Sequence, residues 1–250
     1  MTTPIHILVT CRNVDLFPAS ELVFRSIRTG FPTAPIVVTG NALDIEEEEP
    51  IRQRAKEVGG GFANIYRVTH SEWIAGLINR TPEPFFICDT DVIFWKDMEG
   101  FEFKGPMHGR HVPAFACPVT ETDTMERLHT ALLYIDPREF RQFNQLHREQ
   151  EEAAHPFPIQ LDLVKPVRFA LSNRIMFNDT LGQAFHTLGG FAFSPEMLDC
   201  YDHISCGTYL DLLDKKIPGS LDRQMDYVLH PEKAKGLWRQ QQKYLEGRPV

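Results

Sequence analysis

The first third of the chain alternates short apolar runs with longer segments whose apolar residues recur at helical spacing. Strands that alternate with helices form a parallel sheet covered on both faces, and such strands are continuously apolar. The pattern therefore predicts an α/β fold of Rossmann type, with a mainly parallel sheet. Its strands are expected at "IHILVT" (5–10), "PIVVTG" (35–40), "NIYRV" (64–68) and "FFIC" (85–88).

The segments between these strands carry start and stop signals of helices. A helix is expected from about Pro18, a favoured first helical residue, to Gly30. The stretch "DIEEEEPIRQRAKEVGGG" (44–61) has an acidic start and a basic later part, which suit the helix dipole, and three glycines end it. Thr69 and Glu72 have the spacing of a capping box for a third helix.

The remainder of the chain is less regular, and no boundary divides it, so a single domain is predicted. Residues 95–113 mix charge, Gly, Pro and His and predict a long loop. Its residues His108, Arg110 and His111 are candidates to close over a ligand, and a solvated loop is the plainer alternative. The other elements expected are strands at 131–136 and 189–194 and helices at 137–147, 195–204, 220–229 and 238–250.

Composition and charge narrow the function classes. The formal net charge of -8 argues against a nucleic-acid partner. No apolar run reaches the roughly 20 residues of a membrane span, and no leader pattern is present at the start. The 5 cysteines are scattered without a C-x-x-C pair, which indicates reduced thiols. We therefore expect a cytoplasmic protein without a transmembrane segment.

Two carboxylates, Asp89 and Asp91, stand where the fourth apolar run ends, within "FFICDTDVIF" (85–94). Ligands of open α/β sheets bind beyond the carboxyl ends of the strands. In an extended strand both side chains would point the same way. Oxygen ligands suit Mg²⁺ or Mn²⁺, which would bridge two phosphates. The alternative is an Asp-Thr-Asp turn that only caps the next element.

This segment, with the strand and helix order before it, resembles the D-x-D region of GT-A-fold glycosyltransferases. "HPEKAKGLW" (230–238) resembles the His-Gly-Trp segment of the glycogenin-like families, although their Lys-Pro pair is absent. "HTLGGFAFSP" (186–195) and "LDRQMDYVL" (221–229) fall where such enzymes place a Gly-rich acceptor strand and an Asp-headed helix. The resemblance implies one GT-A-like domain over 1–250, with a nucleotide-binding half at 1–94 and an acceptor-side half at 95–250.

The resemblance also implies a metal site. Asp89 and Asp91 would hold Mn²⁺ or Mg²⁺, and His230 would be the third ligand, with His186 as its competitor. For any single histidine, a structural or surface role is the plainer alternative.

Further roles follow from the same resemblance. Thr10, Arg12 and Asn13 come after the first strand, where GT-A enzymes hold the base and ribose of the nucleotide, although Arg12 could equally be an ordinary surface arginine. Asp222 would contact the acceptor hydroxyl, as base or as orienting group, unless it is only a helix N-cap.

The predicted function is a metal-dependent glycosyltransferase of hexosyltransferase type. It would transfer a sugar from a nucleotide-diphosphate sugar, a UDP-sugar by default, to an unidentified hydroxyl acceptor. One alternative is a sugar- or nucleotide-binding module with a vestigial site. Another is a haloacid dehalogenase-type phosphatase, although that class places its D-x-D at the start of the domain. Sugar-nucleotide pyrophosphorylases need a Gly-rich signature after the first strand, and "TCRNVDLFP" has no glycine.

Overall fold

The computed structural model describes residues 2–10, 20–117, 122–150, 163–171, 174–178, 180–204 and 226–245. The chain forms two compact units. The first unit comprises Met1–Arg67, Ile87–Phe101 and Ser194–Val250, and the second comprises Val68–Phe86 and Glu102–Phe193. The main sheet has seven strands, of which β4-β1-β2-β3 are consecutive, as are β12-β6-β9.

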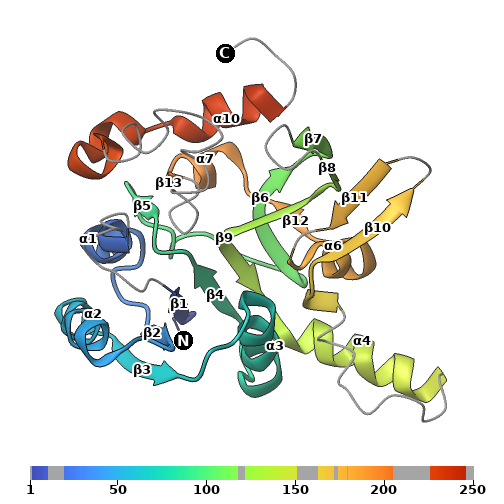
Figure 1. Cartoon of the computed structure of the whole chain (residues 1–250), viewed down its shortest axis with the longest axis horizontal. Coiled ribbons are helices and arrows are strands. Elements are labelled where there is room, and N and C mark those ends of the chain that lie inside the picture. Colours follow the sequence, from blue (N-terminus) through green and yellow to red (C-terminus); the bar gives the residue numbers. More distant parts are fainter. Residues whose placement is uncertain are drawn as a thin grey trace. The chain divides into compact units, whose positions relative to one another are not determined.

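The first unit contains the predicted parallel strands. β1 (Ile5–Val9) pairs with β2 (Ile36–Asn41), which pairs with β3 (Gly61–Ile65), all in parallel. Every residue of β1 is buried, as expected for a strand covered on both faces. Figure 1 shows α1 (Ser20–Gly30) and α2 (Ile45–Glu57) beside these strands. The predicted α/β class, with a mainly parallel sheet, is confirmed.

The helix signals in this unit place the strand boundaries. Asp44 and Glu47 form a capping box at the start of α2, since each side chain accepts the other residue's backbone N–H. Gly59, with φ +68°, reverses the chain after the helix. The strand then begins at Gly61, three residues earlier than the predicted range 64–68, because only two glycines are needed for the turn.

The rest of the first unit corrects one prediction. The helix expected at 195–204 ends early, as α7 (Pro195–Leu198), and the chain continues as β13 (Tyr201–His203). β13 pairs in antiparallel orientation with β5 (Val92–Phe94), and this pairing buries all three of its residues. The helix does begin at Pro195, as predicted, and the pairing of β13 with β5 ends it early.

The C-terminal part of this unit agrees with the sequence pattern where it is described. Residues 226–229 are helical, and the rest of the predicted helix 220–229 lies outside the described residues. A short 3-10 helix η3 (Pro231–Ala234) precedes α10 (Leu237–Leu245), the helix expected in this tail.

The second unit begins with α3 (His70–Arg80), whose capping box at Thr69 and Glu72 is confirmed. The unit's three strands of the main sheet are β6 (Met107–Val112), β9 (Arg127–Ile135) and β12 (Phe191–Ala192). β6 pairs with β9 in antiparallel orientation and with β12 in parallel. β4 (Phe85–Cys88) spans the border between the units.

The prediction of a loop over 95–113 is wrong for its last third, which forms β6. A register shift between Gly109 and Arg110 interrupts the alternation of buried and partly buried residues along this strand. The irregularity hid the period-two pattern by which strands are recognised.

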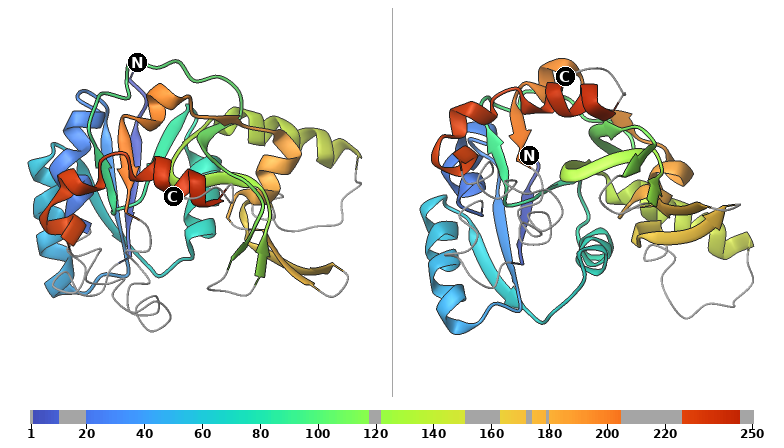
Figure 2. Two further views of the ribbon diagram at one scale, coloured as in Figure 1. Left: turned by 90° about the horizontal axis from the view of Figure 1, so that it is seen from above. Right: turned by 45° about the horizontal axis from the view of Figure 1, so that its top comes forward.

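The second unit also holds a four-stranded sheet that the sequence pattern did not indicate (Figure 2). Its strands follow the order β10-β11-β8-β7, and each is short. The strands of this sheet and the remaining helices are β7 (Phe115–Cys117), β8 (Thr122–Thr124), β10 (Val167–Leu171), β11 (Arg174–Asn178), α4 (Pro137–Gln150) and α6 (Gly182–Leu188).

None of the helices in the described ranges has the length and apolar character needed to cross a membrane.

Candidate metal centre

The two predicted metal ligands lie on a turn between strands. β4 ends at Cys88 and β5 begins at Val92, so Asp89, Thr90 and Asp91 connect them. The backbone N–H of Val23, in α1, donates to the carbonyl oxygen of Thr90 at 3.2 Å. Strand alternation is therefore not what brings the carboxylates together. The turn does so, and Asp91 is buried to 5 % exposure in the process.

The packing of α1 against β5 supports this turn. The Oγ of Ser26 accepts the backbone N–H of Phe94 at 3.0 Å and donates to the carbonyl of Leu22. The backbone of Gly30 approaches Phe94 so closely that an added Cβ would lie 2.3 Å from the ring atom Cδ1. Phe94, three residues after the turn, is thus held by α1 through the backbone of Gly30 and the hydroxyl of Ser26.

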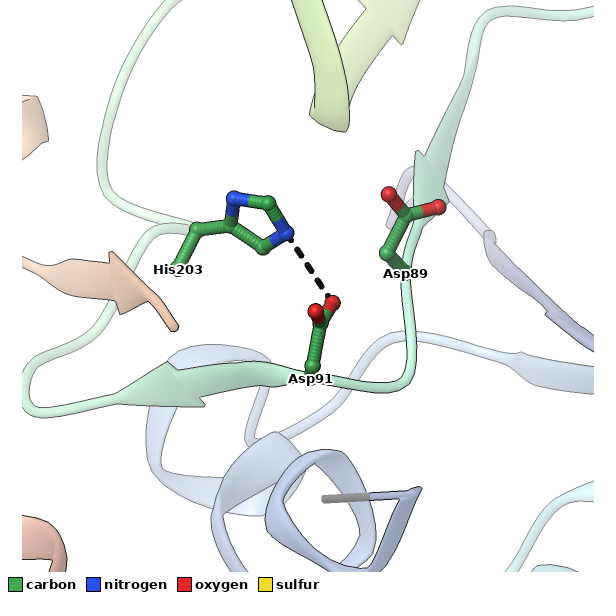
Figure 3. A group of neighbouring side chains, drawn as sticks. All are labelled: Asp89, Asp91 and His203. Atoms are coloured by element: carbon green, nitrogen blue, oxygen red, sulfur yellow. Dashed lines mark ion pairs between the residues drawn. The ribbon is translucent and has the colours of Figure 1, made fainter. Parts of the chain in front are cut away.

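A histidine from a distant part of the chain meets this turn. In the pairing of β13 with β5, His203 is the partner of Val92, and the N–H of Ile204 donates to the carbonyl of Asp91 at 3.1 Å. The imidazole Nε2 of His203 lies 3.0 Å from Oδ1 of Asp91. Figure 3 shows these two side chains facing each other, with Asp89 beside them. The histidine side chain is buried, like that of Asp91.

One ligand atom from each of Asp89, Asp91 and His203 lies within 4.8 Å of the other two. An ion with metal–ligand bonds of about 2.1 Å holds its ligand atoms about 3 to 4 Å apart, so small side-chain rotations suffice to enclose one. Two carboxylates and one imidazole leave a net negative site. The carboxylate oxygens suit Mn²⁺ or Mg²⁺, and the imidazole nitrogen favours a transition-metal ion such as Mn²⁺ over Mg²⁺. The residues present therefore fit a divalent cation.

Cys88 borders the site but does not join the donor set. Burial raises the pKa of its thiol well above the usual value, and the negative charges of Asp89 and Asp91 raise the pKa further. The thiol stays protonated, and its Sγ donates to the carbonyl oxygen of Asp89 at 3.3 Å. Thiolate coordination is therefore disfavoured at this position.

The two histidines predicted as third ligands are not part of this group. His230 lies in the first unit at the start of η3, with its side chain 54 % exposed and Nδ1 3.9 Å from Oε1 of Glu232. His186 is exposed on α6 in the second unit. The group formed by the described residues uses His203 in that position.

The residues predicted to hold the nucleotide and the acceptor are only partly described. Thr10 follows β1 and is half-buried. Arg12, Asn13 and Asp222 lie outside the described residues. Of the loop residues, Arg110 is buried in β6, and the ring of His108 stacks on that of Phe191 at 5.0 Å. His111 lies 2.6 Å from Glu126.

The sequence pattern did not point to His203, because the helix expected from Pro195 would have placed it on a helix face. The segment "CYDHI" (200–204) also lacks the alternation of apolar and polar residues by which a half-buried strand is recognised. Its partner strand lies more than a hundred residues earlier, and pairing over that distance cannot be read from local spacing.

No family model matches the chain, and no curated protein matches it. Solved structures do resemble it. The glycosyltransferase GlyE of Streptococcus pneumoniae TIGR4 is 12% identical with a TM-score of 0.43, over 78% of this chain and 46% of that one. The chain thus spans about half the length of that enzyme.

Two further solved structures belong to the same class of enzyme. The galactosyltransferase LgtC, solved with donor and acceptor sugar analogs, is 10% identical with a TM-score of 0.48, over 90% of this chain and 95% of that one. The mannosyltransferase PcManGT of Pyrobaculum calidifontis, solved with GDP-Man and Mn²⁺, is 10% identical with a TM-score of 0.40, over 57% of this chain and 47% of that one. At these identities and TM-scores the likenesses carry no argument about activity, and the function of the chain has to rest on its own residues.

Proposed function

We propose that the protein is a metal-dependent glycosyltransferase that transfers a sugar from a nucleotide-diphosphate sugar to a hydroxyl acceptor. The observation that carries this proposal is the group of Asp89, Asp91 and His203 beyond the carboxyl end of β4. Ligands of α/β sheets bind at such strand ends. A cation held there, Mn²⁺ or Mg²⁺, would neutralise the charge that develops on a leaving diphosphate.

The chain's own residues would prepare the site for this role. The Nε2 atom of His203 and the Oδ1 atom of Asp91 lie 3.0 Å apart, so two prospective ligand atoms already face each other. A cation would bind His203 through an imidazole nitrogen that carries no proton, and the carboxylates through their oxygens. His203 is thus our choice of third ligand, and the role of His230 remains a prediction to be tested beside it.

The other roles in this proposal come from the sequence resemblance. Thr10, Arg12 and Asn13 would hold the nucleotide, with a UDP-sugar as the default donor, and Asp222 would contact the acceptor hydroxyl. The nucleotide would bind in the half at 1–94 and the acceptor in the half at 95–250.

A panel of nucleotide sugars tests the proposal. The purified protein is incubated with each donor and Mn²⁺, and released nucleotide is measured for the wild type and for the double variant Asp89→Asn/Asp91→Asn. We expect one donor to be turned over, with loss of activity in the double variant and in EDTA. Asp226→Asn is the control for a lost carboxylate outside the site, because it removes one charge at a partly exposed position where Asp226 pairs with Lys233.

Each other outcome has a defined meaning. Metal-dependent binding of a nucleotide without turnover would identify a binding module. No binding of any donor, or full activity of the double variant, would overturn the proposal. The variants His203→Gln and His230→Gln decide which histidine is the third ligand. Only the loss of the coordinating histidine should lower Mn²⁺ affinity.

A further inference from the structure

The residue before His203 is the most deeply buried carboxylate among the described residues. Asp202 is 1 % exposed, and a buried charge is costly unless donors surround it. Its Oδ2 accepts the indole Nε1–H of Trp95 at 2.8 Å and the backbone N–H of Gly236 at 2.7 Å. Its Oδ1 accepts the backbone N–H of Trp238 at 2.9 Å. Three donors thus compensate the buried charge.

These donors come from two distant parts of the first unit. Trp95 follows β5, whereas Gly236 and Trp238 lie at the start of α10. One carboxylate therefore joins β5, β13 and the C-terminal segment. The apolar cluster of Leu22, Ile93, Ile204, Val228 and Ala234 packs the same three regions together.

The position of Asp202 in β13 allows it to fix the orientation of the adjacent residue, His203. Successive side chains of a strand point to opposite faces. Asp202 points to the C-terminal segment, and His203 points to Asp91. Three hydrogen bonds on one face of β13 therefore fix the rotation of the strand, and with it the direction of the imidazole on the other face.

We propose that Asp202 is a positioning residue of the metal site, which holds His203 in the direction that a cation requires. The inference rests on the proposed function, since it concerns the same site. Groups that hydrogen-bond a metal ligand directly typically contribute 10- to 100-fold in metal affinity. Asp202 bonds instead to Trp95, Gly236 and Trp238 and acts on His203 through the backbone of β13, so we expect the lower end of that range.

A titration of the purified full chain with Mn²⁺ tests this inference. The electron paramagnetic resonance signal of free Mn²⁺ reports how much of the ion is bound. We expect the Kd of Asp202→Asn to rise about tenfold, because the amide keeps one oxygen and turns an NH₂ toward the N–H donors. Trp95→Phe removes one donor and keeps the carboxylate, so its Kd should rise less than tenfold. Hydrogen exchange at the amides of Gly236 and Trp238 should be slow in the wild type and faster in Asp202→Asn.

The control is again Asp226→Asn, whose Kd should stay within about twofold of the wild type. This result would show that the loss of one negative charge is not what weakens Mn²⁺ binding in Asp202→Asn. A purely structural role would lower the stability of Asp202→Asn but leave the Kd of the folded protein unchanged. A Kd within twofold of the wild type for folded Asp202→Asn overturns the inference. If that variant does not fold, as judged by circular dichroism, an unchanged Kd of Trp95→Phe overturns it.

The variant Asp91→Asn separates this inference from the proposed function. If the wild type binds Mn²⁺, Asp91→Asn does not, and Asp202→Asn binds as the wild type does, only the positioning role is lost. If the wild type binds no Mn²⁺, the metal site and the positioning role fall together.

Discussion

The proposed metal site has two arms that are built in different ways. The carboxylate arm, residues 89–91 with the ends of β4 and β5, places two ligands within three consecutive residues. The histidine arm, β13 with residues 236–238, places one ligand through strand pairing and the bonds of Asp202. The first depends on local backbone geometry and the second on contacts distant in sequence. Substitutions in the two arms should therefore differ in their effects.

The largest effect is expected from the carboxylate arm itself. Asp91→Asn removes the charge that lies 3.0 Å from His203, where the two arms meet. Mn²⁺ affinity should fall by more than about 100-fold, exceeding the effect of substitutions that only orient a ligand. Titration with Mn²⁺ measures this. His203→Gln should cost less, because both carboxylates remain, and a larger loss for His203→Gln would reverse the ranking of the arms.

The second effect concerns β1, which lies next to β4 in the sheet. Burial lowers the pKa of His6 in β1 from its usual 6.5 to about 4. Between these values the unfolded chain binds a proton that the native protein does not, so stability falls as the pH drops from about 6.5 to 4. The full loss is about 3 kcal/mol.

Urea unfolding at several pH values measures this loss. His6→Asn should remove that part of the pH dependence, whereas His186→Asn, exposed on α6, should leave it intact. An unchanged pH profile in His6→Asn would show that the histidine is not responsible. Because the sheet supports the carboxylate arm, Mn²⁺ affinity near pH 5 should follow the folded fraction.

The third effect tests the support beneath the carboxylate arm. In Gly30→Ala the new Cβ would lie 2.3 Å from Phe94, so α1 and β5 must move apart, at a cost of about 2 kcal/mol. Urea unfolding gives the free energy. Gly100→Ala is the matched control, because an added Cβ meets nothing within 4 Å there. Equal stability of the two variants would contradict the close contact between α1 and β5.

The smallest effect tests the histidine arm. Gly236 has φ +80°, and its N–H donates to Asp202. Gly236→Ala should cost about 1 kcal/mol in unfolding free energy, because an L side chain is disfavoured in this conformation. Mn²⁺ affinity should nevertheless fall more than in Gly30→Ala at equal folded fraction, since residues 236–238 hold Asp202. The opposite order would mean that the histidine arm does not depend on this segment.

Local signals predicted those elements that local physics determines. The apolar runs gave β1, β2 and β4, and the spacing of Thr69 and Glu72 gave the start of α3. Asp89 and Asp91 were found because both lie beside one strand end. His203 was not, since its position depends on the pairing of β13 with β5. The strand β6 was also not predicted, because its register shift breaks the period-two pattern of buried residues.

The distance along the chain between the ligands has a consequence for biosynthesis. A ribosome exposes Asp89 and Asp91 more than a hundred residues before His203, and Trp238 emerges later still. A nascent chain therefore offers only the two carboxylates of this group until residue 203 has emerged. Tight capture of a cation would then mark the completion of the first unit, and protein truncated before residue 203 should leave the ion in the surrounding buffer.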